Sequence, residues 1–469
     1  MHSDLQQEWL QNHTFDELFI GQVASITRLL TEADINGFAA VSGDLNPTHL
    51  DEAFARGEGL NGRTAHGMWS GAMISTLLGT VFPGPGTVYI EQRMRFLAAA
   101  RAGDTLDISV TVKHKDASTA QVSLDCAVRR RDGTDLMLGE AIVRAPLIKQ
   151  RVPAASGLRW KVFDAAAGVQ ALLAEAHKHA RLRCAIVHPC DTESLRGALD
   201  AAAHGLFTPI IVAPRERLLA VADEAGLDLA GCEIEDVPHS HAAAERAAHL
   251  AATGVVQALM KGSLHTDELM KAVLSRPELR TKRRLSHVFR FHVPMYHKPL
   301  MVTDAALNIA PTLEEKVHIV QNAIDLARVL GVERPKVAVL AAVESVNPKM
   351  LCTLDAAALC KMADRGQITG GIIDGPLAFD NAISAEAAQT KGIYSQVAGD
   401  PDILVVPDLV SGNILAKQLE YLAGAMGSGL VLGARVPIAL TSRSDGATAR
   451  LASAALAVLL AHSYTTKPI

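Results

Sequence analysis

An acid and an imidazole stand close together near the start of the 469-residue chain, at Asp44 and His49. This spacing does not place two side chains on one face of a helix, but the Asn46-Pro47 pair between them favours a bend that can bring them together. An imidazole that is oriented by a carboxylate can activate water, which is otherwise a poor nucleophile at neutral pH. The alternative is an aspartate that caps a turn and a histidine exposed on a loop.

A second segment of interest, residues 62–69, leads into an apolar stretch at residues 68–78 that is expected to be a buried helix. The first amides of a helix have no acceptor within it, so the N–H of Gly67 is a ready donor to a developing oxyanion. We expect His66, directly before it, to be structural rather than catalytic.

Near the other end of the chain, residues 437–446 combine a short apolar strand with a polar loop. The loop carries a hydroxyl, a guanidinium and a carboxylate, at Ser442, Arg443 and Asp445. Arginine can bind an oxyanion through two parallel, charge-assisted hydrogen bonds. The alternative is an ordinary surface turn with an Arg–Asp ion pair.

The elements before residue 150 predict an α+β unit. Segments with period-two alternation, separated by Gly-Asp and Asp-Gly turns, predict an antiparallel sheet with strands at residues 87–96, 105–113, 119–129 and 136–143. A helix over residues 31–41, with Thr31 as its N-cap, comes before the apolar helix.

Residues 149–159 are polar, contain Pro and Gly, and are expected to form a linker. Beyond them, short apolar strands alternate with Ala-rich helices, which predicts a mostly parallel α/β sheet with ligands bound beyond the carboxyl ends of its strands. These strands are expected at residues 185–188, 209–212, 258–260, 336–340, 403–406 and 438–440. Gly424, Gly427, Gly429 and Gly433 are expected at helix ends and turns.

The D-x-N-P-x-H loop, the His-Gly-Met start of the apolar helix and the strands that follow closely resemble the MaoC-like (R)-specific enoyl-CoA hydratases. The resemblance covers about residues 12–148 and implies a hotdog domain at residues 1–148. The implied reaction is hydration of a trans-2-enoyl-CoA to the (R)-3-hydroxyacyl-CoA. A thioesterase with the hotdog fold is the nearest rival.

This resemblance also implies roles for single residues. Asp44 and His49 would hold and deprotonate a water molecule, and one of them would return a proton to the α-carbon of the substrate. The amide of Gly67 would hydrogen-bond the thioester carbonyl. Asn46 and Ser75 are expected to bind the substrate, Ser75 because it matches a serine that supports the site in these hydratases.

Several segments of the second part look like the phosphate acetyl/butyryltransferases, in collinear order over about residues 160–465. They are residues 259–262, 285–287, 303–311, 375–382 and 412–415. The resemblance implies two α/β subdomains with a cleft between them in a domain of residues 160–469, one of about 160–283 plus 438–469 and one of about 284–437. The implied reaction converts acyl-CoA and orthophosphate to acyl phosphate and coenzyme A.

In this second domain the resemblance places Ser442 and Arg443 at the reacting carbonyl and phosphate. Arginine suits both, because negative charge builds on the carbonyl oxygen while an anionic nucleophile attacks. Asp445 is a candidate base for the coenzyme A thiol in the reverse direction, although the family's carboxylate could stand a few residues further on.

Lys261, Gly262 and Lys271 are expected to bind the substrate. Lys271 stands where the acetyl-specific members carry an arginine, and lysine cannot make the same bidentate contact. This departure favours the butyryl-type branch, and acyl-chain length stays open.

Composition excludes some functions. The net charge is −5, and no segment interleaves aromatics with Lys or Arg, so a nucleic-acid partner is not expected. The longest apolar runs are too short to span a membrane, no secretory signal is recognisable, and the six scattered cysteines fit a cytoplasmic protein. No metal site is predicted, because the histidine pairs at 177/179 and 239/241 lack companion ligands.

The sequence thus predicts a bifunctional enzyme with no permanently bound cofactor, whose substrates are coenzyme A thioesters and phosphate. Since both families assemble into dimers or larger species, a homo-oligomer is expected. The alternative is that only the first domain catalyses, with the second acting as an acyl-CoA-binding regulatory or oligomerisation module.

Overall fold

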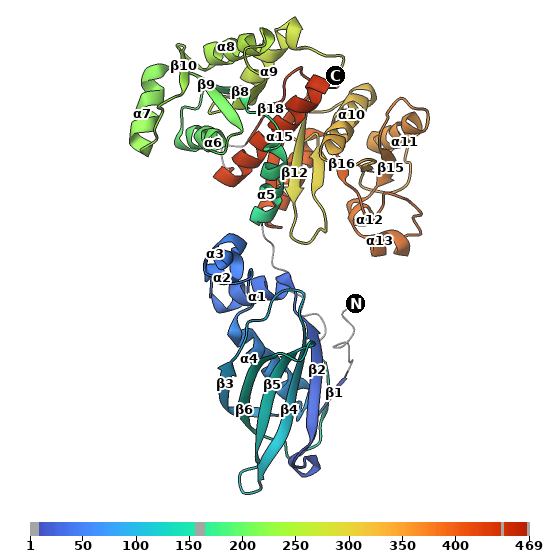
Figure 1. Cartoon of the computed structure of the whole chain (residues 1–469). Helices are drawn as coiled ribbons and strands as arrows, with labels where there is room; N and C mark the ends of the chain where they lie inside the picture. Colours follow the sequence, from blue (N-terminus) through green and yellow to red (C-terminus); the bar gives the residue numbers. More distant parts are fainter. Residues whose placement is uncertain (1–8, 155–164, 442–444, 467–469) are drawn as a thin grey trace. The chain divides into compact units, whose positions relative to one another are not determined.

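The computed structural model describes residues 9–154, 165–441 and 445–466. The chain divides into two compact units, Met1–Val162 and Phe163–Ile469 (Figure 1), and each is described by itself. Within the segment predicted as a linker, β7 (Arg151–Pro153) is a short strand that pairs with β1 (Trp9–Gln11) of the first unit. Residues 155–159 of that segment lie outside the described residues.

The sheet of the first unit has five antiparallel strands in the order β2-β4-β5-β6-β3. They are β2 (Val23–Leu29), β3 (Val88–Phe96), β4 (Thr105–Asp116), β5 (Gln121–Arg130) and β6 (Asp135–Arg144). Buried and less buried side chains alternate along much of β4 and β5, as the period-two pattern predicted. The four predicted strands are confirmed, and β2 was not predicted.

A central helix, α4 (Gly67–Thr76), packs against this sheet (Figure 1). Its Trp69 and Ile74 belong to the same buried apolar cluster as Ile108 and Leu124 of the sheet. The π-helical turn η2 (Leu77–Val81) continues the helix. One apolar helix against a five-stranded antiparallel sheet is the hotdog arrangement, so the predicted α+β fold is confirmed.

The helix α1 (Glu32–Ser42) begins as predicted after Thr31, whose side chain accepts the N–H of Asp34. It ends at Gly43, whose φ of 74° is a left-handed conformation that glycine adopts without strain. The remaining helices of this unit are short: α2 (Pro47–Leu50), α3 (Glu52–Gly57) and the 3-10 turn η1 (Phe15–Glu17).

The second unit contains an eleven-stranded sheet in the order β10-β9-β8-β11-β18-β17-β12-β13-β16-β14-β15. Parallel blocks at both ends flank antiparallel pairings in the middle, which join β18, β17, β12 and β13. The strands are β8 (Leu182–Val187), β9 (Phe207–Ala213), β10 (Glu233–Asp236), β11 (Ala258–Lys261), β12 (Ser286–His292), β13 (Leu300–Thr303), β14 (Lys336–Leu340), β15 (Ile372–Leu377), β16 (Ile403–Val405), β17 (Met426–Leu432) and β18 (Ile438–Ala439).

The chain ends in a long helix, α15 (Ala447–Thr466), which is largely buried and packs against α5, α6 and β17. The strand before it, β18, pairs with β11, so the last segment of the chain returns to the first parallel block. The other helices are α5 (Ala165–Ala176), α6 (Thr192–Ala203), α7 (Arg215–Ala225), α8 (Ser240–Ala252), α9 (Thr266–Leu274), η3 (Pro277–Leu279), α10 (Leu313–Val329), α11 (Leu351–Asp364), α12 (Phe379–Ile383), α13 (Ala385–Thr390) and α14 (Leu409–Tyr421).

Two of the four glycines expected at helix ends and turns lie elsewhere. Gly427 and Gly429 are inside the strand β17, and that prediction was wrong for both. A Cβ atom on Gly429 would lie 2.3 Å from the carbonyl oxygen of Leu440, so the close approach of the chain after β18 requires glycine. Gly424 and Gly433 have positive φ angles of 62° and 94°, which fits the predicted turns.

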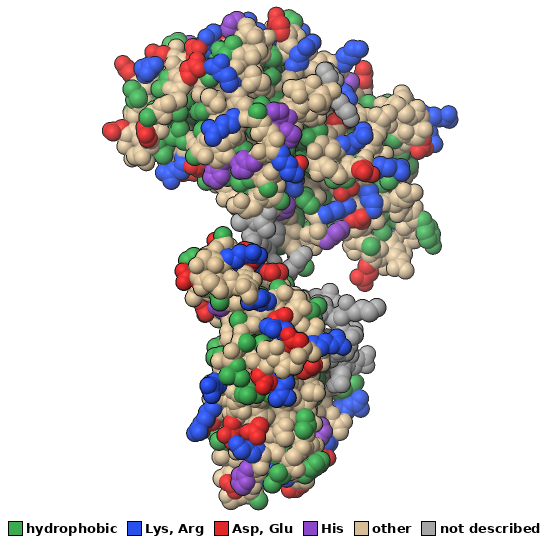
Figure 2. Space-filling view, viewed as in Figure 1, with side chains coloured by type: hydrophobic (Ala, Val, Ile, Leu, Met, Phe, Trp, Pro, Cys, Tyr) green, Lys and Arg blue, Asp and Glu red, His purple; other side chains and the backbone are tan. Residues whose placement is uncertain are grey.

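The surface carries mixed charge. On the face shown in Figure 2, acidic and basic side chains are interspersed over each unit. Among the described helices, none combines the length and apolar character needed to cross a membrane.

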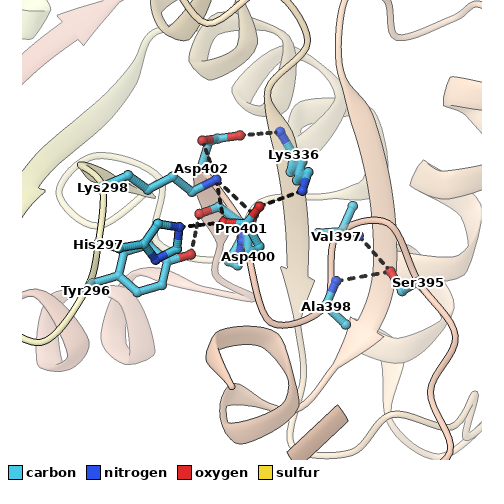
Figure 3. A network of polar contacts seen from close by, with 10 residues as sticks. All are labelled: Tyr296, His297, Lys298, Lys336, Ser395, Val397, Ala398, Asp400, Pro401 and Asp402. Atoms are coloured by element: carbon cyan, nitrogen blue, oxygen red, sulfur yellow. Dashed lines mark hydrogen bonds and ion pairs between the residues drawn. The ribbon is translucent and has the colours of Figure 1, made fainter. Parts of the chain in front are cut away.

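An ion-pair network ties together the amino ends of three neighbouring strands of the second unit (Figure 3). Asp400 and Asp402 precede β16, Lys298 precedes β13, and Lys336 is the first residue of β14. The Nζ atom of Lys298 lies 2.9 Å from Asp400 and 2.7 Å from Asp402, and that of Lys336 lies 2.6 Å from Asp400. The network lies where these three strands begin and contains none of the predicted site residues, so we assign it to stability.

Asp400→Asn is expected to lower the free energy of unfolding by about 1 kcal/mol at pH 7, a figure reduced for solvent screening because the side chain is 39% exposed. Partial burial acts to raise the pKa of Asp400, but hydrogen bonds from Lys336 and Lys298 outweigh it and hold the pKa at about 2. Because this pKa lies below the ordinary value, the stabilisation is present above about pH 4 and is lost as the pH falls towards 2.

Urea unfolding between pH 7 and pH 3 measures this difference. Asp364→Asn, which breaks an exposed pair with Lys361 on α11, is the matched control and should change stability by less than about 0.5 kcal/mol. If the difference in the free energy of unfolding between wild type and Asp400→Asn stays constant down to pH 3, the assignment is wrong.

Candidate active sites

The loop after α1 brings the predicted acid and imidazole of the first unit together. A carboxylate oxygen of Asp44 and one ring nitrogen each of His49 and His66 all lie within 4.8 Å of one another. The bend arises because Gly43 ends α1 and because Asn46 caps α2 with its side-chain oxygen, 3.1 Å from the N–H of Thr48. This spacing of three side chains would also admit a metal ion, a possibility that the sequence did not raise.

The tautomer of His49 follows from its surroundings. Its Nδ1 lies 2.8 Å from the carbonyl oxygen of Thr64, and since a carbonyl only accepts, Nδ1 carries the proton and Nε2 keeps its lone pair. Arg63 braces the same residue by donating from Nε to the carbonyl oxygen of His49 at 2.8 Å. The guanidinium also binds Asn36 and Glu32 of α1, at 2.6 and 2.8 Å. No feature of the sequence indicated these contacts of Arg63.

Gly67 is the first residue of α4 and is exposed. A Cβ atom there would lie 3.3 Å from the ring of Phe96, which is closer than most side-chain contacts. The amides of this first helical turn have no acceptor within the helix and stand at its positive end. The Gly67 amide therefore directly follows His66, whose ring lies with Asp44 and His49 in one cluster, and its role as an oxyanion donor stays a prediction.

The two predicted substrate-binding residues of this unit are placed differently. The Asn46 side-chain oxygen accepts hydrogen bonds from the N–H and the hydroxyl of Thr48, so it serves the fold of the loop. Ser75 lies on an exposed part of α4. Their roles in binding substrate stay predictions.

In the second unit, the carboxyl ends of three adjacent parallel strands, β8, β11 and β18, lie side by side. His188 follows β8, Lys261 ends β11, and Thr441 follows β18, so these residues gather at one edge of the sheet. Ser442 and Arg443, both predicted to be catalytic, lie outside the described residues. The third predicted residue of that loop, Asp445, is described and partly buried.

Glycine is required at position 262 because two backbone segments meet there. A Cβ atom on Gly262 would lie 2.5 Å from the carbonyl oxygen of His188 and 2.6 Å from that of Val187. Lys261 is 6% exposed, and its Nζ donates to the Gly262 carbonyl oxygen at 3.2 Å. Lys261 thus lies at the carboxyl end of a parallel strand, where such sheets bind ligands, and its role in binding substrate stays a prediction.

A further arginine, Arg450 of α15, supports the loop that carries Ser442 and Arg443. It is 2% exposed and donates from Nη1 to the hydroxyl of Thr441 at 2.9 Å and from Nε to the carbonyl oxygen of Asp445 at 3.1 Å. It thus holds both flanks of the loop. The signal that could have revealed it is a lone arginine within an otherwise apolar helix.

A buried polar cluster lies at the start of β12 and directly after β13. The main-chain N–H of His287 donates to Asp304 at 3.2 Å, and the Asp304 carboxylate also accepts from Ala306, Leu307 and Asn308. Burial lowers the pKa of His287 to about 4, so its ring is neutral at pH 7. His287 and Asp304 belong to two segments that are separate in the sequence, residues 285–287 and 303–311.

Lys271 has surroundings that differ from those expected. It is exposed on α9, lies 3.5 Å from Asp267, and borders a groove of about 360 Å³ that is also lined by Glu245 and Glu268. Carboxylates around a lysine do not favour an anionic ligand. Its substrate role is therefore still a prediction.

Comparisons with known proteins find matches for both parts of the chain. Residues 240–458 match the family model described as phosphate acetyl/butaryl transferase, and residues 20–130 match the MaoC like domain. A phosphate acetyltransferase of Rhizobium meliloti is 58% identical over 291 residues, which are 62% of this chain and 92% of that protein.

Among solved structures, a branched-chain phosphotransacylase from Enterococcus faecalis V583 is 32% identical over 60% of this chain and 99% of its own, with a TM-score of 0.53. The (R)-hydratase PhaJ1 from Pseudomonas aeruginosa is 39% identical over 33% of this chain and 99% of its own, with a TM-score of 0.32. The chain belongs to the phosphate acetyl/butyryltransferase family and carries a MaoC-like hydratase domain before the transferase domain.

Proposed function

We propose that the chain is a bifunctional acyl-CoA enzyme. Its first unit hydrates a trans-2-enoyl-CoA to the (R)-3-hydroxyacyl-CoA, and its second exchanges the acyl group between coenzyme A and orthophosphate. The observation that carries the proposal is the meeting of Asp44 and His49 within 4.8 Å, close to Gly67, the residue that begins α4. A second unit without catalysis is not favoured, because it is 58% identical to a protein named as a phosphate acetyltransferase.

For hydration, the side chains of Asp44 and His49 hold one water molecule. His49 contributes the lone pair of Nε2, since Nδ1–H is bound to Thr64. As the water oxygen bonds to the β-carbon, one of the pair takes a proton from it, and a proton is returned to the α-carbon. The Gly67 amide donates to the thioester oxygen, which gains negative charge in the transition state.

For acyl transfer, a phosphate oxygen attacks the thioester carbonyl, the C–S bond breaks, and the coenzyme A thiolate takes up a proton. Arg443 and Ser442 stabilise the carbonyl oxygen and the phosphate, and Asp445 handles the thiol proton. Because the 58% identical relative is an acetyltransferase, we propose that short acyl groups, acetyl included, are the substrates.

The test uses the purified full-length chain with two assays. We expect hydration of crotonyl-CoA without phosphate, and release of coenzyme A from acetyl-CoA or butyryl-CoA only when phosphate is added. Release of coenzyme A from saturated acyl-CoA without phosphate would instead indicate a thioesterase. Absence of hydration under conditions where transfer proceeds would remove the first half of the proposal.

We also propose a homo-oligomer that forms through the first unit. Strand β3 is an edge of its sheet and exposes Val88, Ile90 and Phe96, and an apolar edge strand readily pairs with another chain. Ile90→Lys is expected to reduce the mass found by sedimentation velocity. An unchanged mass would place the subunit contact elsewhere.

A cytoplasmic location completes the proposal. All six cysteines are free, which suits a reducing compartment, and no other partner than coenzyme A thioesters and phosphate is required by the two reactions.

A further inference from the structure

His66 joins the two parts of the proposed hydration site. It immediately precedes α4 and is 3% exposed. Its Nε2 lies 2.9 Å from the main-chain carbonyl oxygen of Asp44, so Nε2–H donates this hydrogen bond. The loop that carries the acid is thereby tied to the residue next to Gly67, which supplies the oxyanion donor.

The ring of His66 also packs on the imidazole of His49. The two ring centroids are 3.8 Å apart, with an angle of 31° between the planes. Phe38 of α1 packs against the His66 ring as well, with centroids 5.1 Å apart. The orientation of His66 is therefore fixed by its packing, and its ring limits where the His49 ring can lie.

Stability of α4 does not explain this residue. Ser, Thr, Asp or Asn at the N-cap position would bond a free amide of the first turn, whereas the His66 side chain makes no such bond. Its Nδ1 is buried and has no hydrogen-bond partner among the described residues, which costs free energy. What His66 does provide is contact with both Asp44 and His49.

We propose that His66 is a positioning residue of the hydration site. It holds the side chains of Asp44 and His49 in position relative to the Gly67 amide. The inference rests on the proposed hydratase function. It matters because the acid, the imidazole and the oxyanion donor come from separate elements, and a misplacement of about 1 Å can lower a rate about 100-fold.

Two variants distinguish the hydrogen bond from His66 to Asp44 from the packing of its ring on His49. His66→Gln places an amide N–H at the same number of bonds from Cα as Nε2–H, so it can keep the hydrogen bond to Asp44. His66→Phe keeps a ring against His49 and loses the donor. We expect His66→Phe to lower kcat for crotonyl-CoA hydration about 30- to 100-fold with KM changed less than about 3-fold, and His66→Gln to stay within about 10-fold of wild type.

The matched control is His114→Gln, which changes an exposed histidine of β4 and should leave hydration unchanged. Phosphate-dependent release of coenzyme A in the same preparations reports on the second unit. If thermal unfolding shows that His66→Phe does not fold, His66→Ala replaces it in the comparison with His66→Gln.

Two results would overturn the inference. One is a wild-type kcat in His66→Phe, and the other is an equal loss of kcat in His66→Phe and His66→Gln. If wild-type protein does not hydrate crotonyl-CoA, or if Asp44→Asn is fully active, the proposed function itself fails. If wild-type protein hydrates crotonyl-CoA and Asp44→Asn does not, but His66→Phe is unaffected, only the role of His66 is rejected.

Discussion

Asp44→Asn is expected to lower kcat for crotonyl-CoA hydration by about 10³-fold and to leave phosphate-dependent release of coenzyme A unchanged. Asparagine has nearly the same shape and keeps an oxygen for the N–H of Asn46, which Asp44 binds at 3.2 Å. The fold of the loop should therefore persist. The substitution removes the negative charge and the basic oxygens, and general acid–base groups typically contribute 10² to 10⁴ in rate.

The measurement is the loss of enoyl absorbance over time, with coenzyme A release assayed on the same preparation. Asp51→Asn is the matched control, because Asp51 is a nearby aspartate that caps α3 and asparagine caps equally well. Combining Asp44→Asn with His49→Gln should cost little more than either change alone, since both residues act on one water. If Asp44→Asn keeps a tenth or more of the wild-type kcat for hydration, Asp44 is not a catalytic residue.

The features that the sequence predicted correctly depend on near neighbours. The Asn46-Pro47 bend, the Thr31 cap and the alternating strands β3 to β6 are set within a few residues. The Asp44–His49 pair could be predicted for the same reason. Sequence patterns thus predicted the approach of Asp44 to His49 and the hotdog sheet, because both are encoded in short segments.

The features that were missed depend on tertiary contact. Strands β12 and β17 escaped prediction because buried polar residues interrupt their apolar pattern, as His287 and Arg290 do, and because Gly427 and Gly429 resemble turn residues. Inside the sheet these glycines make room for neighbouring chain segments. Local propensity cannot anticipate a position at the centre of an eleven-stranded sheet.

The supporting residues of both sites were missed for the same reason. Arg63 reaches back to α1, and Arg450 reaches from α15 to the ends of a loop that contains the predicted catalytic residues. Each acts through another residue rather than on a substrate. The partners of these two arginines become visible only when the chain is folded. The local sequence around Arg63 gives no sign of its role, and the apolar helix around Arg450 indicates burial without indicating which groups it binds.

Arg443→Ala is expected to lower phosphate-dependent release of coenzyme A by about 10³-fold and to leave hydration unchanged. Phosphate and the developing carbonyl oxyanion both carry negative charge, and loss of one fixed donor to such charge costs about 10²- to 10³-fold. Arg443→Lys should also be strongly impaired, because an ammonium cannot form two parallel hydrogen bonds. Arg450, which holds Thr441 and Asp445 on either side, remains in both variants and keeps the flanks of the loop in place.

The matched control for this change is Arg435→Ala, since Arg435 precedes β18 and is exposed. Both reactions should proceed at wild-type rates in that variant. If transfer persists in Arg443→Ala, the acyltransfer site lies elsewhere on the carboxyl edge, where the buried Lys261 is the next group to test. If hydration falls together with transfer, the two units do not act independently and the two-site proposal is wrong, because the Asp44 and His49 site shares no described residue with the Arg443 loop.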